Sequence, residues 1–291
     1  MGELLALMTA LLWALGVVMY KKSVGFVAPF SLNVFKNCVA FVLLAGTTVA
    51  LGQSRSISVP PKDLAIILVS GALGIGVSDS FYFMALSRIG ASRTALMDCL
   101  YSPFVIFFSI LMLNEKLAPL SIVGGLLILS SVTVSTQRHF GHSIDRKQLW
   151  TGCAFAVAAM ATVGFAVVLV SPLLPRYPLA WVSTVRMAGG IIFVLLVVPV
   201  HPNRKSVYEA FRPQPGWKWM LLGTFFGSYL SLMCWLAGFK YAHAGVAALL
   251  NQTSTVIIVL LAALFLHEPL TKLKLVAVGM AFIGVALVLY R

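Results

Sequence analysis

Long apolar runs, separated by short polar or charged segments, follow one another along the whole chain. A transmembrane helix needs about 20 mainly apolar residues to cross roughly 30 Å of hydrocarbon. The runs are continuous rather than alternating, which argues against a transmembrane barrel. The pattern predicts an all-α integral membrane protein with ten transmembrane helices, over residues 3–20, 31–51, 63–86, 91–113, 119–137, 148–170, 179–200, 217–239, 244–266 and 271–290.

The composition fits this class and excludes most others. Of the 291 residues, 60% are hydrophobic and 10% charged, with a mean hydropathy of +0.98, whereas soluble domains are about 45–50% apolar and about 25% charged. The net charge of +13 comes mostly from Lys and Arg between the apolar runs, so it indicates membrane-flanking charge rather than a nucleic-acid partner. The four cysteines lie singly, with no metal-binding or disulfide pattern. Because nucleotide-binding and hydrolase motifs are missing from the sequence, we expect no cofactor, no metal and no enzymatic activity.

A weak internal repeat appears when the chain is shifted by 153 residues. The shift aligns residues 71–134 with 224–287 and superimposes the motif Leu-x-Leu-x-Glu-x-Leu that closes the fourth and ninth spans. We therefore predict two five-helix units, residues 1–137 and 148–291. Because five is odd, the second unit must enter the membrane from the opposite side. The units are then inverted repeats, an arrangement typical of secondary transporters.

Short motifs in both halves identify a family resemblance. The tripeptide Leu-Trp-Ala at residues 12–14 and the hairpins Asn-Glu-Lys-Leu and His-Glu-Pro-Leu after spans four and nine resemble the EamA-type branch of the drug/metabolite transporter (DMT) superfamily. Asn114 and His267 stand where that family usually has Gly. The resemblance implies a ten-span carrier of amino acids, other metabolites or drugs, working by alternating access without ATP hydrolysis. The hairpin glutamates, Glu115 and Glu268, are expected to cap helices rather than to act in catalysis.

The two sets of loops differ in charge. Of the 21 Lys and Arg residues, thirteen lie at one set of loops, six at the other and two inside spans. Positive residues favour the cytoplasmic side, which places both termini outside, whereas the family resemblance implies both termini inside. We follow the charge distribution and expect an integral protein of the cell (inner or plasma) membrane.

Four ionisable residues lie inside spans, where a charge is costly and marks a candidate functional site: Lys36, Asp79, Asp98 and Arg186. At 1.5 Å per residue, the first three lie roughly 8–11 Å below the same membrane face and can meet at one level. Lys36 or Arg186 would bind a substrate carboxylate and Asp98 an amine, while Asp79 and Asp98 are proton-coupling candidates. The alternatives are a structural ion pair between Lys36 and either aspartate, and snorkelling of Lys36 and Arg186 to an interface.

Polar and aromatic residues extend this candidate site across both halves. Asn251 is the repeat counterpart of Asp98, and Asn33 shares a helix face with Lys36. Interhelical hydrogen bonding is the alternative role for the polar residues of the ninth span. The predicted substrate-binding set is completed by Gln252, Thr255, Trp13, Tyr101, Tyr229 and Trp235.

Proline and glycine mark candidate hinge and packing positions. Pro103 interrupts the fourth span just after Asp98, which favours a kink. Gly74 and Gly76 in the third span, and Gly227 in the eighth, are spaced for close helix contact or for a hinge.

Together these patterns predict a secondary transporter of a small polar or zwitterionic, amino-acid-like metabolite, with a proton as candidate coupling ion. An exporter of hydrophobic amphiphiles or drugs is the alternative within transport. A non-transporting membrane receptor or assembly subunit is the alternative of another class. The expected partners are the small-molecule substrate and the lipid bilayer, and not nucleic acid. Gly124 and Gly125 in the fifth span would allow close packing between protomers, so a homodimer stays open.

Overall fold

The computed structural model describes residues 2–53, 59–113, 120, 123–124, 126–128, 130–131, 145–202, 204–235 and 244–289, and all regular structure within these ranges is helical. Six helical segments of this part are long and apolar enough to cross a membrane: Gly2–Ser23, Pro29–Ala50, Pro61–Ile89, Ala91–Met112, Arg146–Leu173 and Leu179–Val200. The predicted class, an all-helical membrane protein, therefore holds. The predicted fifth span, residues 119–137, lies largely outside the described residues.

The described helices follow the order of the predicted spans. Those of the first half are α1 (Gly2–Ser23), α2 (Pro29–Ala50), α3 (Pro61–Gly71), η1 (Ala72–Val77), α4 (Ser78–Ile89), α5 (Ala91–Asp98) and α6 (Tyr101–Leu113). Those of the second half are α8 (Arg146–Val170), η2 (Ser171–Leu173), α9 (Leu179–Val197), η3 (Val198–Val200), α10 (Arg204–Ala210), α11 (Trp217–Gly223), η4 (Thr224–Leu230), α13 (Ala244–Leu266) and α14 (Lys272–Leu289). Pro29 and Pro61 begin α2 and α3, where the missing N–H costs no intrahelical hydrogen bond.

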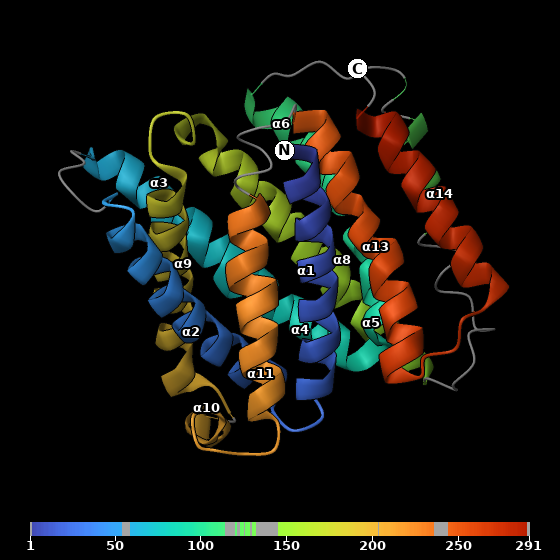
Figure 1. The fold of residues 1–291 in the computed structure, drawn as a ribbon, viewed down its shortest axis with the longest axis horizontal. Helices are drawn as coiled ribbons and strands as arrows, with labels where there is room; N and C mark the ends of the chain where they lie inside the picture. Colours follow the sequence, from blue (N-terminus) through green and yellow to red (C-terminus); the bar gives the residue numbers. More distant parts are fainter. Residues whose placement is uncertain are drawn as a thin grey trace.

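The bundle pairs helices of one half with helices of the other. α1 packs against α13 and α11, while α8 packs against α4 and α6, and α2 lies beside α9. Figure 1 shows α1 beginning and α14 ending at the same end of the bundle. The largest hydrophobic cluster contains residues of both halves, among them Tyr20, Leu96, Met160 and Ile258. The halves therefore share one core.

Two π-helical segments interrupt the long helices at related places in the two halves. η1 covers Ala72–Val77 and η4 covers Thr224–Leu230, and the 153-residue shift carries 72–77 onto 225–230. Single π turns are rare and often lie at functional sites. The sequence predicted one continuous span over 63–86, so the π geometry of η1 is a finding of the structure.

The predicted fourth span, 91–113, is two helices rather than one. α5 ends at Asp98, residues 99–100 form a turn, and α6 starts at Tyr101. Pro103 lacks an N–H, and its ring would clash with the carbonyl of Cys99 in a regular helix. The backbone changes there to i→i−3 bonds, from Leu100 N to Met97 O at 2.9 Å, before Phe104 N returns to Leu100 O at 3.1 Å.

Two further features were not predicted by the apolar pattern. α10 lies between the seventh and eighth spans and is seen end-on below the bundle in Figure 1. Its Val207 and Ala210 are buried. In the fifth span, Gly124 packs inside the chain, because a Cβ on Gly284 would lie 2.8 Å from its carbonyl oxygen. Gly125 lies outside the described residues.

Candidate functional site

A cavity of about 300 Å³ lies between the two halves. Its wall combines aromatic, hydroxyl, charged and aliphatic side chains. The first half contributes Thr9, Trp13, Tyr20, Lys36, Ile75, Ser78, Asp79, Tyr82, Phe83, Asp98 and Tyr101, and the second half contributes Met160, Val163, Met187, Gly227, Ser228, Ser231, Leu232, Trp235, Asn251 and Ser254.

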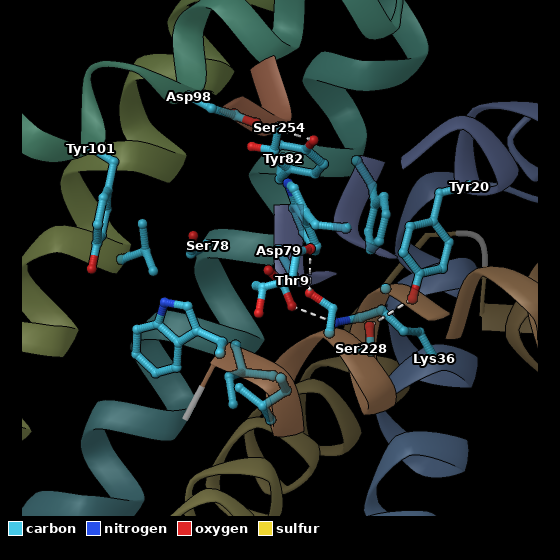
Figure 2. A pocket seen from close by; sticks show the side chains of 18 of the residues that line it. Thr9, Tyr20, Lys36, Ser78, Asp79, Tyr82, Asp98, Tyr101, Ser228 and Ser254 are labelled. Carbon is cyan, nitrogen blue, oxygen red and sulfur yellow. Dashed lines mark hydrogen bonds and ion pairs between the residues drawn. The ribbon is translucent and has the colours of Figure 1, made fainter. Parts of the chain in front are cut away.

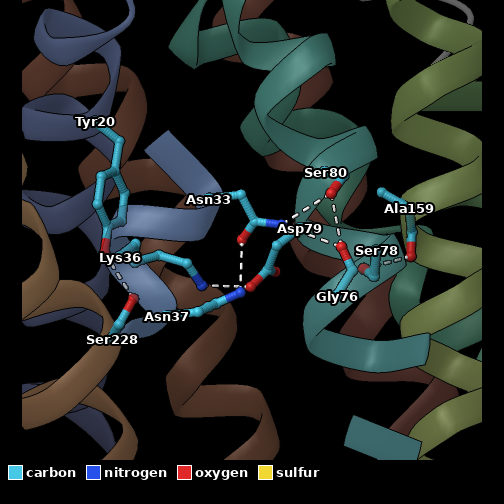
Figure 3. Close-up of polar contacts among 10 residues, drawn as sticks. All are labelled: Tyr20, Asn33, Lys36, Asn37, Gly76, Ser78, Asp79, Ser80, Ala159 and Ser228. Carbon is cyan, nitrogen blue, oxygen red and sulfur yellow. Dashed lines mark hydrogen bonds and ion pairs between the residues drawn. The ribbon is translucent and has the colours of Figure 1, made fainter. Parts of the chain in front are cut away.

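One side of the cavity is an ion pair between α2 and α4. Lys36 Nζ donates a hydrogen bond to Asp79 Oδ2, as Figure 3 shows. The Lys36 side chain is 6% exposed and that of Asp79 24% exposed. Burying an unpaired charge costs free energy, and each of these two residues is the counter-ion that offsets this cost for the other. The pair brings no net charge to the cavity.

An asparagine network positions the helix that carries Asp79. Asn33 Nδ2 donates to Gly76 O at 3.1 Å and to Ser80 Oγ at 2.9 Å, and Asn37 Nδ2 donates to Asn33 Oδ1 at 3.0 Å. Gly76 lies in the π segment η1. There the regular pattern of helical backbone hydrogen bonds is interrupted, so a backbone carbonyl can accept a hydrogen bond from a side chain. Asn33 is fully buried and does not line the cavity. The structure places it as a support for Asp79.

The opposite side of the cavity carries hydrogen-bond acceptors that lack partners. Tyr82 OH donates to Asp98 Oδ2 over a long 3.4 Å. Asp98 Oδ1 and Asn251 Oδ1 are buried and have no hydrogen-bond partner among the described residues. The Trp13 ring lies 5.9 Å from that of Tyr82. Figure 2 shows Asp98, Tyr82 and Ser254 together on this side, away from Lys36 and Tyr20. The arrangement suits a ligand that brings N–H donors.

The second half closes the wall at η4. Tyr20 OH and Ser228 Oγ are 2.6 Å apart. α1 and η4 approach closely enough for this bond because glycines face each other: a Cβ on Gly227 would lie 3.0 Å from Gly16 Cα. Gly227 thus allows η4 to reach the cavity.

Like Asn33, Tyr229 and Thr255 of the predicted binding set lie outside the cavity wall. The Tyr229 hydroxyl is 2.8 Å from Thr47 Oγ1. Thr255 Oγ1 donates to Ala95 O at 3.4 Å, linking α13 to α5. Both side chains are engaged in contacts between the two halves.

Arg186 is half-buried beside the cavity rather than in its wall. Its backbone packs directly against Gly71, and its Nη2 lies 3.2 Å from where a Cβ on Gly74 would be. Its Nε has no hydrogen-bond partner among the described residues. The side chain of Gln252 lies outside the described part of the structure.

Several wall residues were not predicted from the sequence. Tyr20 lies near the end of the first span, where tyrosines often anchor to the interface. Thr9, Ser228 and Ser231 are small polar residues that are common in membrane helices. Only the three-dimensional packing distinguishes them from ordinary core residues. The internal repeat could have indicated Ser228, because the 153-residue shift pairs it with Ile75, and both residues line the cavity.

The fold and the site together define a helical membrane protein with a central cavity of mixed polarity, shared by two halves. Within the described residues no cluster of three or more His, Cys, Asp or Glu could hold a metal. Ligand sites of helical membrane proteins commonly lie in cavities of this kind.

Comparison with known proteins identifies the family. The EamA-like transporter family matches residues 1–137 and 150–290. An uncharacterized transporter of Archaeoglobus fulgidus is 20% identical over 290 residues, covering 98% of this chain and 97% of that protein. A protein with a solved crystal structure shares the fold with a TM-score of 0.69 at 20% identity, covering 98% of this chain and 95% of the other. The chain belongs to the EamA-like transporter family, which confirms the resemblance to the DMT superfamily. The family and the transporter relative support a membrane transporter rather than an enzyme.

Proposed function

We propose that this protein is a secondary active transporter of a small polar or zwitterionic, amino-acid-like metabolite. One observation carries the proposal: Asp98 and Asn251, which are repeat counterparts in the two halves, line the same cavity, and each has a buried oxygen without a hydrogen-bond partner among the described residues. A buried acceptor without a hydrogen-bond partner destabilises the folded protein, because its lost hydration is not replaced. A bound ammonium group would supply the missing donors to both.

Alternating access between two inverted five-helix repeats is the proposed mechanism. Three observations support it: the family matches the chain in two successive segments, the π segments are related by the repeat shift, and α1–α13 packing is mirrored by α8–α6 packing. In inverted-repeat carriers the site lies at the repeat interface, and one repeat rocks against the other.

The carboxylate end of the substrate would be held by cations on the other side of the cavity. Lys36 already pairs with Asp79, so it becomes available only when Asp79 is protonated or displaced. A substrate carboxylate and a proton on Asp79 would therefore arrive together, which couples the two thermodynamically. Arg186, whose side chain lies next to Gly74, is the second candidate cation. Asp79 and Asp98 are the proton-coupling candidates.

The experiment is a thermal-shift screen of the purified protein against amino acids, amines, organic acids and sugars at two pH values. A ligand that binds the folded state raises the melting temperature by mass action. We expect zwitterions to give the shift, and expect Lys36→Ala and Asp98→Asn each to abolish it. Hits would then be tested for uptake into proteoliposomes. If no zwitterion shifts the melting temperature and none crosses the membrane, the proposal fails and a non-transporting subunit becomes the better reading.

An exporter of hydrophobic amphiphiles is the second candidate. It is favoured by the aromatic and sulphur-containing part of the wall, which includes Trp13, Phe83, Met160 and Met187. Such side chains adapt to ligands of varied shape. Competition by unrelated amphiphiles, unaffected by Asp98→Asn, would select this function over the first.

The proposed topology places both termini outside the cell membrane. The end of the bundle where α1 finishes carries Lys21 and Lys22, and the last turn of α4 and the first turn of α5 add Arg88 and Arg93. Basic residues favour the cytoplasmic side. The test is to place a cysteine near Gly2 and to treat intact cells with a membrane-impermeant thiol reagent. Labelling would support an external N-terminus, and protection would show that the N-terminus lies inside.

A further inference from the structure

A carboxylate of the second half caps a helix of the first half. Glu268, in the loop between α13 and α14, accepts hydrogen bonds from Ala91 N at 2.8 Å (Oε1) and from Ser92 N at 3.2 Å (Oε2). These are N–H groups of the first turn of α5, which have no partner within the helix. The positive end of the helix dipole also favours the negative charge. Glu268 therefore does for α5 what a local capping residue does elsewhere.

The turn before α5 is shaped to receive this carboxylate. Gly90 has φ +82°, a left-handed conformation that side chains disfavour. A Cβ at Gly90 would also lie only 2.7 Å from Glu268 Oε1. Both the backbone conformation and the space therefore require glycine here. Because the carboxylate fills the space that a side chain at residue 90 would occupy, it fits tightly against the turn.

Lysines hold the same region from two further elements. Lys274 Nζ of α14 lies 3.6 Å from Glu268 Oε2, and its side chain is 5% exposed. Lys21 Nζ of α1 donates to Leu86 O at 2.9 Å and to Ser87 O at 3.3 Å, at the end of α4. The α4–α5 turn is thus held from both sides: Lys21 binds carbonyl oxygens at the end of α4, and Glu268 binds N–H groups at the start of α5.

α5 connects this turn to the cavity. It has eight residues, and its last residue, Asp98, lines the cavity. The turn at Cys99 and Leu100 separates it from α6. Because α5 is short and a turn separates it from α6, we expect a displacement at Ala91 to be carried along the helix to Asp98.

We propose that Glu268 is a positioning residue: it latches the α13–α14 loop to α5, holds Asp98 in the cavity wall, and must release α5 for this end of the bundle to open. The transport part of this inference rests on the proposed function. The structural part does not, because it concerns the attachment of α5 in the protein without a solute.

Two readouts at opposite ends of α5 test the latch. The first is amide hydrogen–deuterium exchange of the peptide covering residues 87–98. The second is labelling of Cys99 by N-ethylmaleimide in a chain whose other three cysteines are replaced by serine, since Cys99 is buried and follows Asp98 directly. The variants are Glu268→Ala, which removes both acceptors, and Glu268→Gln, which keeps one. Thr271→Ala is the matched control: Thr271 Oγ1 accepts from Lys274 N at 3.3 Å in the same loop but does not bond to α5.

Loss of a helix N-cap changes the local opening equilibrium by about tenfold. We therefore expect Glu268→Ala to speed both exchange in 87–98 and Cys99 labelling about tenfold, Glu268→Gln to restore part of the protection, and Thr271→Ala to change neither. Faster exchange at residues 91–92 with unchanged Cys99 labelling would overturn the proposal, because the cap would then be only local. Unchanged exchange would overturn it too. Both readouts are taken without solute, so a failure of transport leaves them intact and a failure of the latch leaves the transport proposal standing.

Discussion

Lys36 of α2 and Asp79 of α4 form an ion pair in the wall of the central cavity, and Asn33 fixes the helix turn on which Asp79 lies. The pair is neutral as a unit, so the carboxyl of Asp98 is the wall carboxyl without a cation partner among the described residues. A solute with a positive group therefore meets its complement at Asp98, while Lys36 is reached only by opening the pair.

Removing one member of the pair should cost more than removing both. Asp79→Asn leaves the ammonium of Lys36 buried without its counter-ion, and breaking a buried pair costs about 3–5 kcal/mol. Replacing both, with Lys36→Met and Asp79→Leu, should restore most of the stability because no charge remains in the wall. The free energy of unfolding of the single and double variants in detergent measures the coupling. Additive single and double losses would show that the two side chains do not depend on each other.

The substitution Asp98→Asn tests the charge of this side chain while nearly keeping its size and shape. The amide keeps an oxygen that can accept from Tyr82, but it carries no charge and takes up no proton. We expect the protein to fold with an unchanged melting temperature while transport is lost or becomes independent of pH. Uptake into proteoliposomes over a range of pH values is the measurement.

Asp63→Asn is the control for this experiment. Asp63 lies at the start of α3, outside the cavity wall, and binds the loop before α9 through Tyr177. It should leave the pH dependence of uptake unchanged. Wild-type uptake and wild-type pH dependence in Asp98→Asn would remove Asp98 from the mechanism.

Much of the fold follows from the apolar runs, and the departures have physical causes. α2 starts two residues before the predicted second span, at Pro29, because a proline is well suited to the first position of a helix. The π segments were not, because a π turn inserts a residue without changing the apolar composition of the run. The break after Asp98 lies at Cys99, four residues before Pro103, since it is the carbonyl at i−4 that a proline ring displaces.

The candidate site was predictable for residues whose contact depends only on their depth in the membrane. Lys36 and Asp79 share one level in the membrane, and the structure brings them into contact. Depth does not say which way a side chain points around the helix axis, so Tyr229 was placed with the binding residues although it faces Thr47. The role of Tyr20 depends on contacts with η4, more than 200 residues away in the sequence.

Stability should depend on pH through a contact at the loop before α9. Tyr177 OH donates to Asp63 Oδ2 at 2.8 Å, and this hydrogen bond to a carboxylate raises the pKa of Tyr177 above its ordinary value. A tyrosine pKa that is raised on folding adds stability that is fully present below the unfolded pKa of about 10 and is lost as the pH rises through the folded value. The difference in melting temperature between wild type and Tyr177→Phe should therefore be constant from neutral pH to about pH 9 and shrink above about pH 10. A difference that grows in alkali would contradict this assignment.

Close contact between α1 and η4 should make Gly227 intolerant of a side chain. A methyl at residue 227 would lie 3.0 Å from Gly16 Cα and 3.3 Å from Tyr20 Cε2, and the backbone of α1 cannot yield as a flexible side chain would. Overpacking of this kind costs about 1–3 kcal/mol, so Gly227→Ala should lower the free energy of unfolding by that amount and disturb the bond between Tyr20 and Ser228. The matched control is Gly46→Ala in α2, where no atom lies within 4 Å of the new methyl; there the better helix propensity of alanine should add up to about 1 kcal/mol. Equal effects of the two substitutions would mean that α1 and η4 do not approach each other as closely as the structure has them.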